Sequence, residues 1–273
     1  MSAQPRSKPR KPVTVTTLQQ MKGQEKFTCL TAYGSSEAHA VSDQGVEVIL
    51  VGDSLGMVIQ GHDSSLPVTI EDVAYHIRCV CRGNQGALIM GDLPFMSFYS
   101  EQVTLENAAV LMREGAQMVK LEGGAWLAES TRLLTQRGIP VCCHMGLMPQ
   151  SVNHLGGFRV QGRDPDKAQE IIDEALVLQD AGAGIVLLEC VPAELGARVT
   201  ESLDIPVIGI GAGPETDGQI MVFHDLLGLY PGRPAKFVKN FLEADGGSIQ
   251  GAIAAYVAAV KDGSFPGPEH CYK

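Results

Sequence analysis

The segment EVILVGDSLGMVIQGHDS, residues 47–64, begins as an apolar run and then turns abruptly polar. The residues from Val48 to Gly52 have the near-continuous apolar character of a strand that is buried on both faces of a parallel sheet. Asp53 and Ser54 follow this run directly. Because a carboxylate is costly to bury without a partner, the first question that the sequence raises is what Asp53 faces.

Similar apolar runs recur along the chain and alternate with segments of helical periodicity. The strand candidates are FTCLTA (27–32), VILVG (48–52), ALIMG (87–91), MVKLE (118–122), IPVCCH (139–144), IVLLEC (185–190), IPVIGI (205–210) and AKFVKNF (235–241). The helix candidates lie at 69–83, 101–116, 125–140, 165–184, 192–206, 216–229 and 248–263.

This alternation predicts an α/β fold, with a (β/α)8 barrel as the leading architecture. An open, doubly wound sheet is the competing fold, since periodicity alone does not show that the sheet closes. The first strand–helix turn has no G-x-G-x-x-G, which speaks against that competitor. Composition does not break along the chain, so we expect residues 13–273 to form a single barrel domain.

The overall charge excludes some classes of function. The formal net charge is −10, and because four basic residues lie in the first twelve positions, the remainder of the chain is more acidic still. Such a body repels phosphate backbones, so no nucleic-acid partner is expected. No run reaches about 18 apolar residues, so no membrane span is expected either.

Two further features bear on where the protein works. The N-terminal MSAQPRSKPRKP, residues 1–12, is followed by no apolar run, so we interpret it as a disordered basic tail rather than a secretory signal. The seven cysteines are odd in number and form no CxxC pair, which favours reduced thiols over disulfides or a zinc site. We therefore expect a cytoplasmic protein.

Polar side chains gather at the carboxyl ends of the predicted strands. In a barrel these ends meet at one mouth, where barrel enzymes build their active sites. Residues far apart in sequence are therefore expected to become neighbours there. They are Asp53, Ser54, Asp92, Lys120, Glu122, His144 and Glu189.

These residue types suit metal-assisted chemistry on an anionic substrate. Asp53, Asp92 and Glu122 offer the hard oxygen ligands that Mg²⁺ prefers. Lys120 adds a fixed positive charge for an anionic substrate or a developing enolate. Glu189 has apolar sequence neighbours, and desolvation there suits a general base. His144 is a candidate for holding a substrate oxygen or shuttling a proton.

Each of these residues also has a structural interpretation. A lone Asp is more often a helix cap or half of a salt bridge, Lys120 and Glu122 share one side of a strand and can simply pair, and His144 fits a buried core histidine. The functional interpretation rests on their concentration at strand ends. GIGAG (209–213) is equally compatible with phosphate binding and with close backbone packing. The long connection at 145–165 is expected to be a lid or binding loop.

An ordered set of motifs resembles the ketopantoate hydroxymethyltransferase family over nearly the whole chain. The set is specific because its members occur in the family's order. The motifs are LVGDSLGMVIQGHDSSLPVT, GDLPF, MVKLEGG, GLMPQSVNHLGGFRVQGR, LECVP, PVIGIGAG-x-x-TDGQ and FVKNF.

The resemblance implies a barrel of the phosphoenolpyruvate/pyruvate superfamily with bound Mg²⁺. It implies that Asp53 and Asp92 hold the metal, with Glu122 behind them or joined through water, and that the metal and these aspartates bind the 2-oxo acid. By the same resemblance, Ser54 and Lys120 grip the substrate carboxylate and His144 contacts the substrate. Glu189 matches the proposed base.

The implied reaction transfers a hydroxymethyl group from 5,10-methylenetetrahydrofolate to 3-methyl-2-oxobutanoate. An enolate on the metal attacks the one-carbon unit and gives 2-dehydropantoate (ketopantoate), in the first committed step of pantothenate biosynthesis. The resemblance also implies a homo-oligomer, commonly a decamer. The chain departs from the family at Gly34, where Asp is usual, and at Met148, where Thr is usual.

Two alternatives remain open from sequence. Another Mg²⁺-dependent 2-oxo acid lyase or aldolase on the same barrel would need a similar enolate site. A non-catalytic binding or assembly barrel would not need the metal carboxylates or Glu189, and this chain has all of them.

Overall fold

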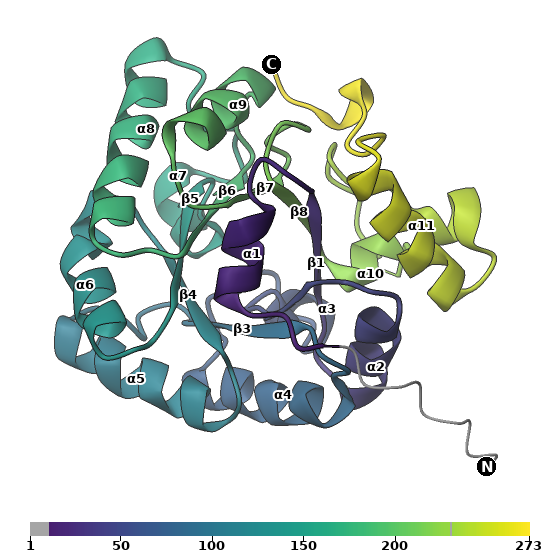
Figure 1. The fold of residues 1–273 in the computed structure, drawn as a ribbon, viewed down its shortest axis with the longest axis horizontal. Coiled ribbons are helices and arrows are strands. Elements are labelled where there is room, and N and C mark those ends of the chain that lie inside the picture. The colour runs from purple at the N-terminus through teal and green to yellow at the C-terminus, as the bar shows by residue number, and fades with distance from the viewer. Residues whose placement is uncertain (1–10, 230) are drawn as a thin grey trace.

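The computed structural model describes residues 11–229 and 231–273, so nearly all of the predicted basic tail lies outside the described residues. Eight parallel strands close into a barrel in chain order, and helices surround it (Figure 1). Closure is direct, because the last strand pairs with both the seventh and the first. The predicted barrel is therefore confirmed, and the open doubly wound sheet is excluded.

The strands are short and nearly all of their residues are buried. They are β1 (Phe27–Thr31), β2 (Val48–Val51), β3 (Leu88–Asp92), β4 (Met118–Glu122), β5 (Val141–Gly146), β6 (Ile185–Glu189), β7 (Val207–Ile210) and β8 (Gly218–Met221).

Helices alternate with the strands, and all of them except α1, which precedes β1, follow a strand. They are α1 (Val15–Met21), α2 (Ser35–Asp43), α3 (Leu55–Val58), α4 (Ile70–Gly83), α5 (Glu101–Arg113), α6 (Ala128–Gln136), α7 (Val152–Leu155), α8 (Pro165–Asp180), α9 (Ala193–Ser202), α10 (Phe223–Leu226) and α11 (Ile249–Lys261). Single turns lie at Ala125–Leu127, Pro149–Ser151, Leu242–Gly246 and Pro268–His270. Among the described helices, none is long and apolar enough to cross a membrane.

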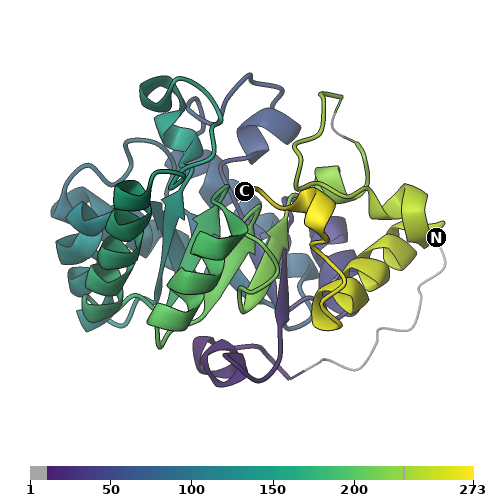
Figure 2. The ribbon, with the colours of Figure 1, turned by 90° about the horizontal axis from the view of Figure 1, so that it is seen from above.

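The alternation of side chains along each strand divides the apolar core in two. On β2, Val48 and Leu50 point into the barrel, whereas Ile49 and Val51 pack under the surrounding helices. The helix α1 lies across the end of the barrel where the strands begin (Figure 2), and its Leu18 belongs to the inner cluster. This end is thus closed by packing, and the opposite end is left for a site.

The last strand is not where the sequence pattern placed it. The segment 235–241 contains no strand, and β8 lies inside 216–229, a segment whose periodicity predicts a helix. In sequence, residues 216–229 resemble a helix because their apolar run is short and polar residues precede it. Gln219 is buried instead and donates hydrogen bonds to the Gly213 carbonyl (3.0 Å) and to Thr216 Oγ1 (2.7 Å). These hydrogen bonds to the preceding turn, together with pairing to β1 and β7, hold a strand that propensity does not favour.

Helix boundaries follow the local capping signals more closely. At the start of α4, Thr69 and Asp72 form a reciprocal capping box, as the sequence predicts. The helices predicted near 101, 125, 165, 192 and 248 correspond to α5, α6, α8, α9 and α11. All seven cysteines lie in the described part of the chain and are free thiols.

Candidate active site

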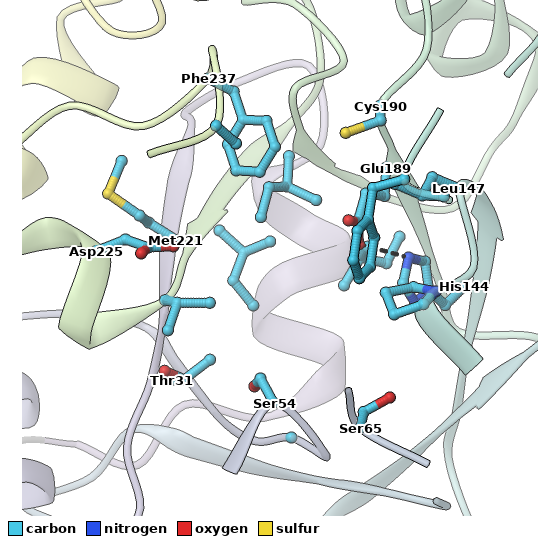
Figure 3. Close-up of a pocket in the computed structure, with 18 of the residues that line it drawn as sticks. Thr31, Ser54, Ser65, His144, Leu147, Glu189, Cys190, Met221, Asp225 and Phe237 are labelled. Atoms are coloured by element: carbon cyan, nitrogen blue, oxygen red, sulfur yellow. Dashed lines mark ion pairs between the residues drawn. The ribbon is translucent and has the colours of Figure 1, made fainter. Parts of the chain in front are cut away.

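The carboxyl ends of the strands surround a cavity of about 520 Å³. All of the side chains predicted from the sequence line it: Asp53, Ser54, Asp92, Lys120, Glu122, His144 and Glu189. Figure 3 shows Ser54, His144 and Glu189 on the wall of this cavity. Because they come from β2, β3, β4, β5 and β6 or the residues just after them, it is barrel closure that brings them together.

A group of three carboxylates lies at the base of the cavity. Asp53, Asp92 and Glu122 each offer an oxygen atom, and these atoms lie within 4.8 Å of one another. All three residues are buried. An all-oxygen set of this kind is suited to a hard divalent cation that keeps some ligands from water or substrate.

Lys120 lies between two of these carboxylates. Its Nζ donates to Asp92 Oδ1 at 2.7 Å and to Glu122 Oε1 at 3.2 Å. The pairing of Lys120 with Glu122, expected because alternate strand residues share a face, is therefore present. Although burial opposes the charge, the neighbouring carboxylates raise the pKa of Lys120 above its ordinary value, so this group stays cationic.

The acidic cluster holds more negative charge than Lys120 can balance. Burial and the charges of Asp92 and Glu122 raise the pKa of Asp53 well above its ordinary value. Burial also raises the pKa of Asp92, against the effect of Lys120. Burial disfavours the charge on Glu122 as well, but Lys120 and His144 outweigh it and lower its pKa to about 2. A divalent cation between the aspartates would offset this repulsion, so the residues present fit one.

His144 connects the acidic cluster with Glu189. Its Nδ1 lies 3.3 Å from Glu122 Oε1 and its Nε2 lies 3.2 Å from Glu189 Oε2, distances of ion pairs without hydrogen-bond alignment. Burial and Lys120 oppose protonation of the ring, yet the two glutamates raise its pKa to about 9. His144 therefore lies between Glu122 and Glu189, and its contact with Glu189 orients that carboxylate toward the ring (Figure 3).

Sequence reasoning missed Gln150, which comes from the long connection after β5. Its backbone N–H donates to Glu122 Oε2 at 3.0 Å, and its Nε2 donates to Asp53 Oδ2 at 2.9 Å. The connection was expected to be a lid or binding loop, but only the folded loop shows which residue turns inward. Gln150 thus supports two carboxylates of the cluster at once.

Tyr33 is a second residue that the sequence did not single out. Its hydroxyl lies 2.7 Å from Ser54 Oγ, so it holds Ser54 at the edge of the cavity. The neighbouring Gly34 is the N-cap of α2, and the Glu37 carboxylate accepts hydrogen bonds from the backbone N–H groups of both residues. Neither Gly34 nor Met148, the two departures from the family pattern, lines the site cavity.

The glycines of GIGAG permit close packing. A Cβ on Gly211 would lie 2.9 Å from the ring of Phe237, and one on Gly213 would lie 2.6 Å from the Cβ of Ala193. Both glycines have positive φ, which other residues adopt at a cost. These contacts favour the packing interpretation over phosphate binding.

Comparison with known sequences gives one consistent family. The sequence model of the family described as ketopantoate hydroxymethyltransferase matches residues 12–268. A 3-methyl-2-oxobutanoate hydroxymethyltransferase from Shewanella amazonensis is 56% identical over 261 residues, covering 95% of this chain and 98% of that protein. A protein from Pseudomonas entomophila, named 3-methyl-2-oxobutanoate hydroxymethyltransferase 2, is 59% identical over 260 residues, covering 94% of this chain and 97% of that protein.

Comparison with solved structures supports the fold. Oxaloacetate acetylhydrolase in complex with its product oxalate has a TM-score of 0.61 at 14% identity, covering 93% of this chain and 99% of that one. A 2,3-dimethylmalate lyase, described as a PEP mutase/isocitrate lyase superfamily member, has a TM-score of 0.56 at 14% identity, covering 77% of this chain and 81% of that one. At such low identity the likeness extends to the barrel alone.

Proposed function

The chain belongs to the ketopantoate hydroxymethyltransferase family, and on that premise we propose how its residues transfer a hydroxymethyl group to 3-methyl-2-oxobutanoate. The product is 2-dehydropantoate, the precursor of pantothenate. We propose 5,10-methylenetetrahydrofolate as the one-carbon donor. In the net reaction the C3–H bond and the two C–N bonds of the folate methylene group break, and a C3–CH2OH bond forms with its hydroxyl group taken from water. Tetrahydrofolate leaves, and its two nitrogens take up the two protons that C3 and water release.

Asp53 and Asp92 are the residues that would hold Mg²⁺, with Glu122 behind them or joined through water. The support is the buried all-oxygen set whose atoms lie within 4.8 Å of one another. When bound, Mg²⁺ would act as a Lewis acid that polarises the keto group and acidifies the C3 proton. Gln150 and Lys120 keep the carboxylates in place through the hydrogen bonds described above.

The remaining side chains bind the substrate carboxylate or remove the C3 proton. Ser54 and Lys120 bind the carboxylate of 3-methyl-2-oxobutanoate, and Tyr33 fixes the position of the Ser54 hydroxyl. Glu189 removes the C3 proton, with its carboxylate oriented by His144 at 3.2 Å. His144 is also within reach of substrate oxygen atoms, since it lines the same cavity.

One observation carries this proposal furthest. In the cavity, His144 lies between Glu122 of the acidic cluster and Glu189, with its ring nitrogens 3.3 Å and 3.2 Å from their carboxylate oxygens. Glu189 therefore faces the acidic cluster across a small cavity. A base that removes a proton next to a metal-polarised carbonyl group requires this position.

The direct test is turnover by the purified protein. We expect formation of 2-dehydropantoate to require 3-methyl-2-oxobutanoate, methylenetetrahydrofolate and a divalent cation, and Asp92→Asn to lower kcat at least 100-fold. Asp204→Asn is the matched control, since Asp204 is exposed. Folate-independent cleavage of a longer 2-oxo acid, without hydroxymethyl transfer, would instead identify a lyase or aldolase.

We also propose that the protein works as a homo-oligomer in the cytoplasm. Phe95, Met96, Tyr99 and Trp126 are large apolar side chains that are about half exposed or more, and Trp126 stacks on Phe98. An apolar patch of this kind is typical of a surface that another chain covers. Light scattering of the purified protein measures the number of subunits, and a monomer at micromolar concentration would contradict the proposal.

A further inference from the structure

The cavity has a second wall that the chemistry described so far does not use. It is formed by the ends of β7 and β8, by α10 and by residues 233–237. In Figure 3, Met221, Asp225 and Phe237 lie across the cavity from His144 and Glu189. A five-carbon oxo acid held at the carboxylate cluster would leave this side of a cavity of about 520 Å³ largely unfilled.

Most of this second wall is apolar. Ile210 and Ile220 belong to the inner core cluster, and Phe237 packs against that cluster from outside. Phe237 reaches the end of β7 because Gly211 has no side chain, and a Cβ there would lie 2.9 Å from its ring. The wall therefore offers an aromatic ring and branched aliphatic groups to a ligand of similar character.

Asp225 is the one acidic group of this wall, and it lies on α10. It is half-buried, and within the described residues no hydrogen bond or ion pair to its carboxylate is present. Burial raises the pKa of Asp225 to about 6. A carboxylate that is partly removed from water and has no protein partner is stabilised by a ligand that supplies hydrogen-bond donors.

We infer that this wall binds the reduced pterin ring of the one-carbon donor, with Asp225 accepting hydrogen bonds from the ring's 2-amino group and N3–H. This inference rests on the proposed function. A pterin presents these two donors side by side on one edge, which matches the two oxygens of a carboxylate. The rest of the ring is a flat, largely apolar body that suits Phe237, Ile210 and Met221.

The same wall also sets the orientation of the pterin in the cavity. With the amino edge at Asp225, the opposite edge of the pterin, which carries the one-carbon unit, faces the side of Glu189 and His144. Arg233, exposed at the outer rim of the cavity, is placed for the carboxylates of the glutamate tail. The oxo acid itself has no reason to bind at Asp225, because two carboxylates repel.

Binding of tetrahydrofolate tests the inference. Isothermal titration of the protein with Mg²⁺ and 3-methyl-2-oxobutanoate present measures its Kd. We expect Asp225→Ala to weaken binding by at least roughly tenfold, because two charge-assisted hydrogen bonds are lost. Asp225→Asn conserves shape but keeps only one acceptor, so its loss is smaller. Asp204→Asn, an exposed control, leaves the Kd unchanged.

A modified ligand separates a direct contact from an indirect effect. A tetrahydrofolate analogue with a methyl group in place of the 2-amino group should bind the wild-type protein roughly tenfold more weakly. With Asp225→Ala the analogue and tetrahydrofolate should bind equally well. If the variant still discriminates between them as the wild type does, Asp225 does not contact the amino group and the inference is wrong.

The outcome is distinguishable from failure of the proposed function. Exchange of the C3 proton of 3-methyl-2-oxobutanoate in D2O is measured on the wild-type protein without folate. No exchange by the wild type contradicts the proposed function itself. Exchange together with tetrahydrofolate binding that is insensitive to Asp225→Ala overturns only the pterin site.

Discussion

Asp53 is the residue at which stability and function oppose each other. In the absence of a cation it is buried beside Asp92 and Glu122, and its pKa is raised well above the ordinary value by burial and these charges. We expect Asp53→Asn to stabilise the metal-free protein by about 1–2 kcal/mol, because one like charge is removed while the shape is kept. Thermal melts without divalent cations measure this change.

The same variant should lose the response to metal. Mg²⁺ raises the melting temperature of a protein that binds it only in the folded state. The wild-type protein should show that rise and Asp53→Asn should not. A metal-free variant that is less stable than the wild type would contradict the expected repulsion at Asp53. An unchanged response to Mg²⁺ would contradict the assignment of Asp53 as a ligand.

Asp225 predicts a pH dependence of stability. Because burial raises its pKa to about 6, the folded state binds more protons than the unfolded state between about pH 4 and 6. Its contribution to stability is therefore present below pH 4 and is lost as pH rises through 6. We expect Asp225→Asn to exceed the wild type in free energy of unfolding by about 1–2 kcal/mol at pH 8, after allowance for partial exposure.

Urea unfolding at both pH values checks this prediction. At pH 4 the carboxyl group of Asp225 is protonated in the folded state and about half protonated in the unfolded state, so most of the difference between variant and wild type should disappear. A difference of equal size at pH 4 and pH 8 would show that the charge of Asp225 is not its origin.

At the scale of elements, the barrel depends on a few places where backbones nearly touch. Gly83, the last residue of α4, is buried against the start of α2, and a Cβ there would lie 1.9 Å from the Ser35 carbonyl oxygen. We expect Gly83→Ala to lower the free energy of unfolding by about 2 kcal/mol, since overpacking outweighs the better helix propensity of Ala.

The adjacent exposed residue provides the control for that prediction. Arg82→Ala should change stability by less than about 0.5 kcal/mol. Chemical denaturation of both variants makes the comparison. If the two variants are equally stable, the contact between α2 and α4 accommodates the added methyl group, and the overpacking argument is wrong.

Elements differ in how far sequence alone can define them. The strand β2 and the helix α4 are predictable, because a continuous apolar run and a capping box carry local signals. The strand β8 is not, because its four residues include the buried Gln219, whose hydrogen-bond partners lie in the preceding turn. A pattern of hydrophobicity cannot represent a polar side chain that is buried in a strand and satisfied by hydrogen bonds to the preceding turn.

At the scale of the whole molecule, the sequence predicts those site residues that the topology of the barrel brings together. Once the strands close into a parallel barrel, residues at their carboxyl ends must meet, which is why the sequence alone groups Asp53, Asp92 and Glu189. Gln150 and Asp225 could not be grouped in this way. Each lies in the segment after a strand, and packing sets the path of that segment. The supporting contacts and the second wall therefore emerge only from the structure.

The most direct measurement is exchange of the C3 proton of 3-methyl-2-oxobutanoate in D2O, followed by proton NMR with Mg²⁺ and without folate. We expect the wild-type protein to catalyse exchange and Glu189→Gln to slow it at least roughly 100-fold with little change in substrate Kd, as for loss of a general base. The matched control is Glu194→Gln, at an exposed glutamate on α9, which should exchange like the wild type. Exchange by Glu189→Gln at near the wild-type rate would contradict the assignment of Glu189 as the base.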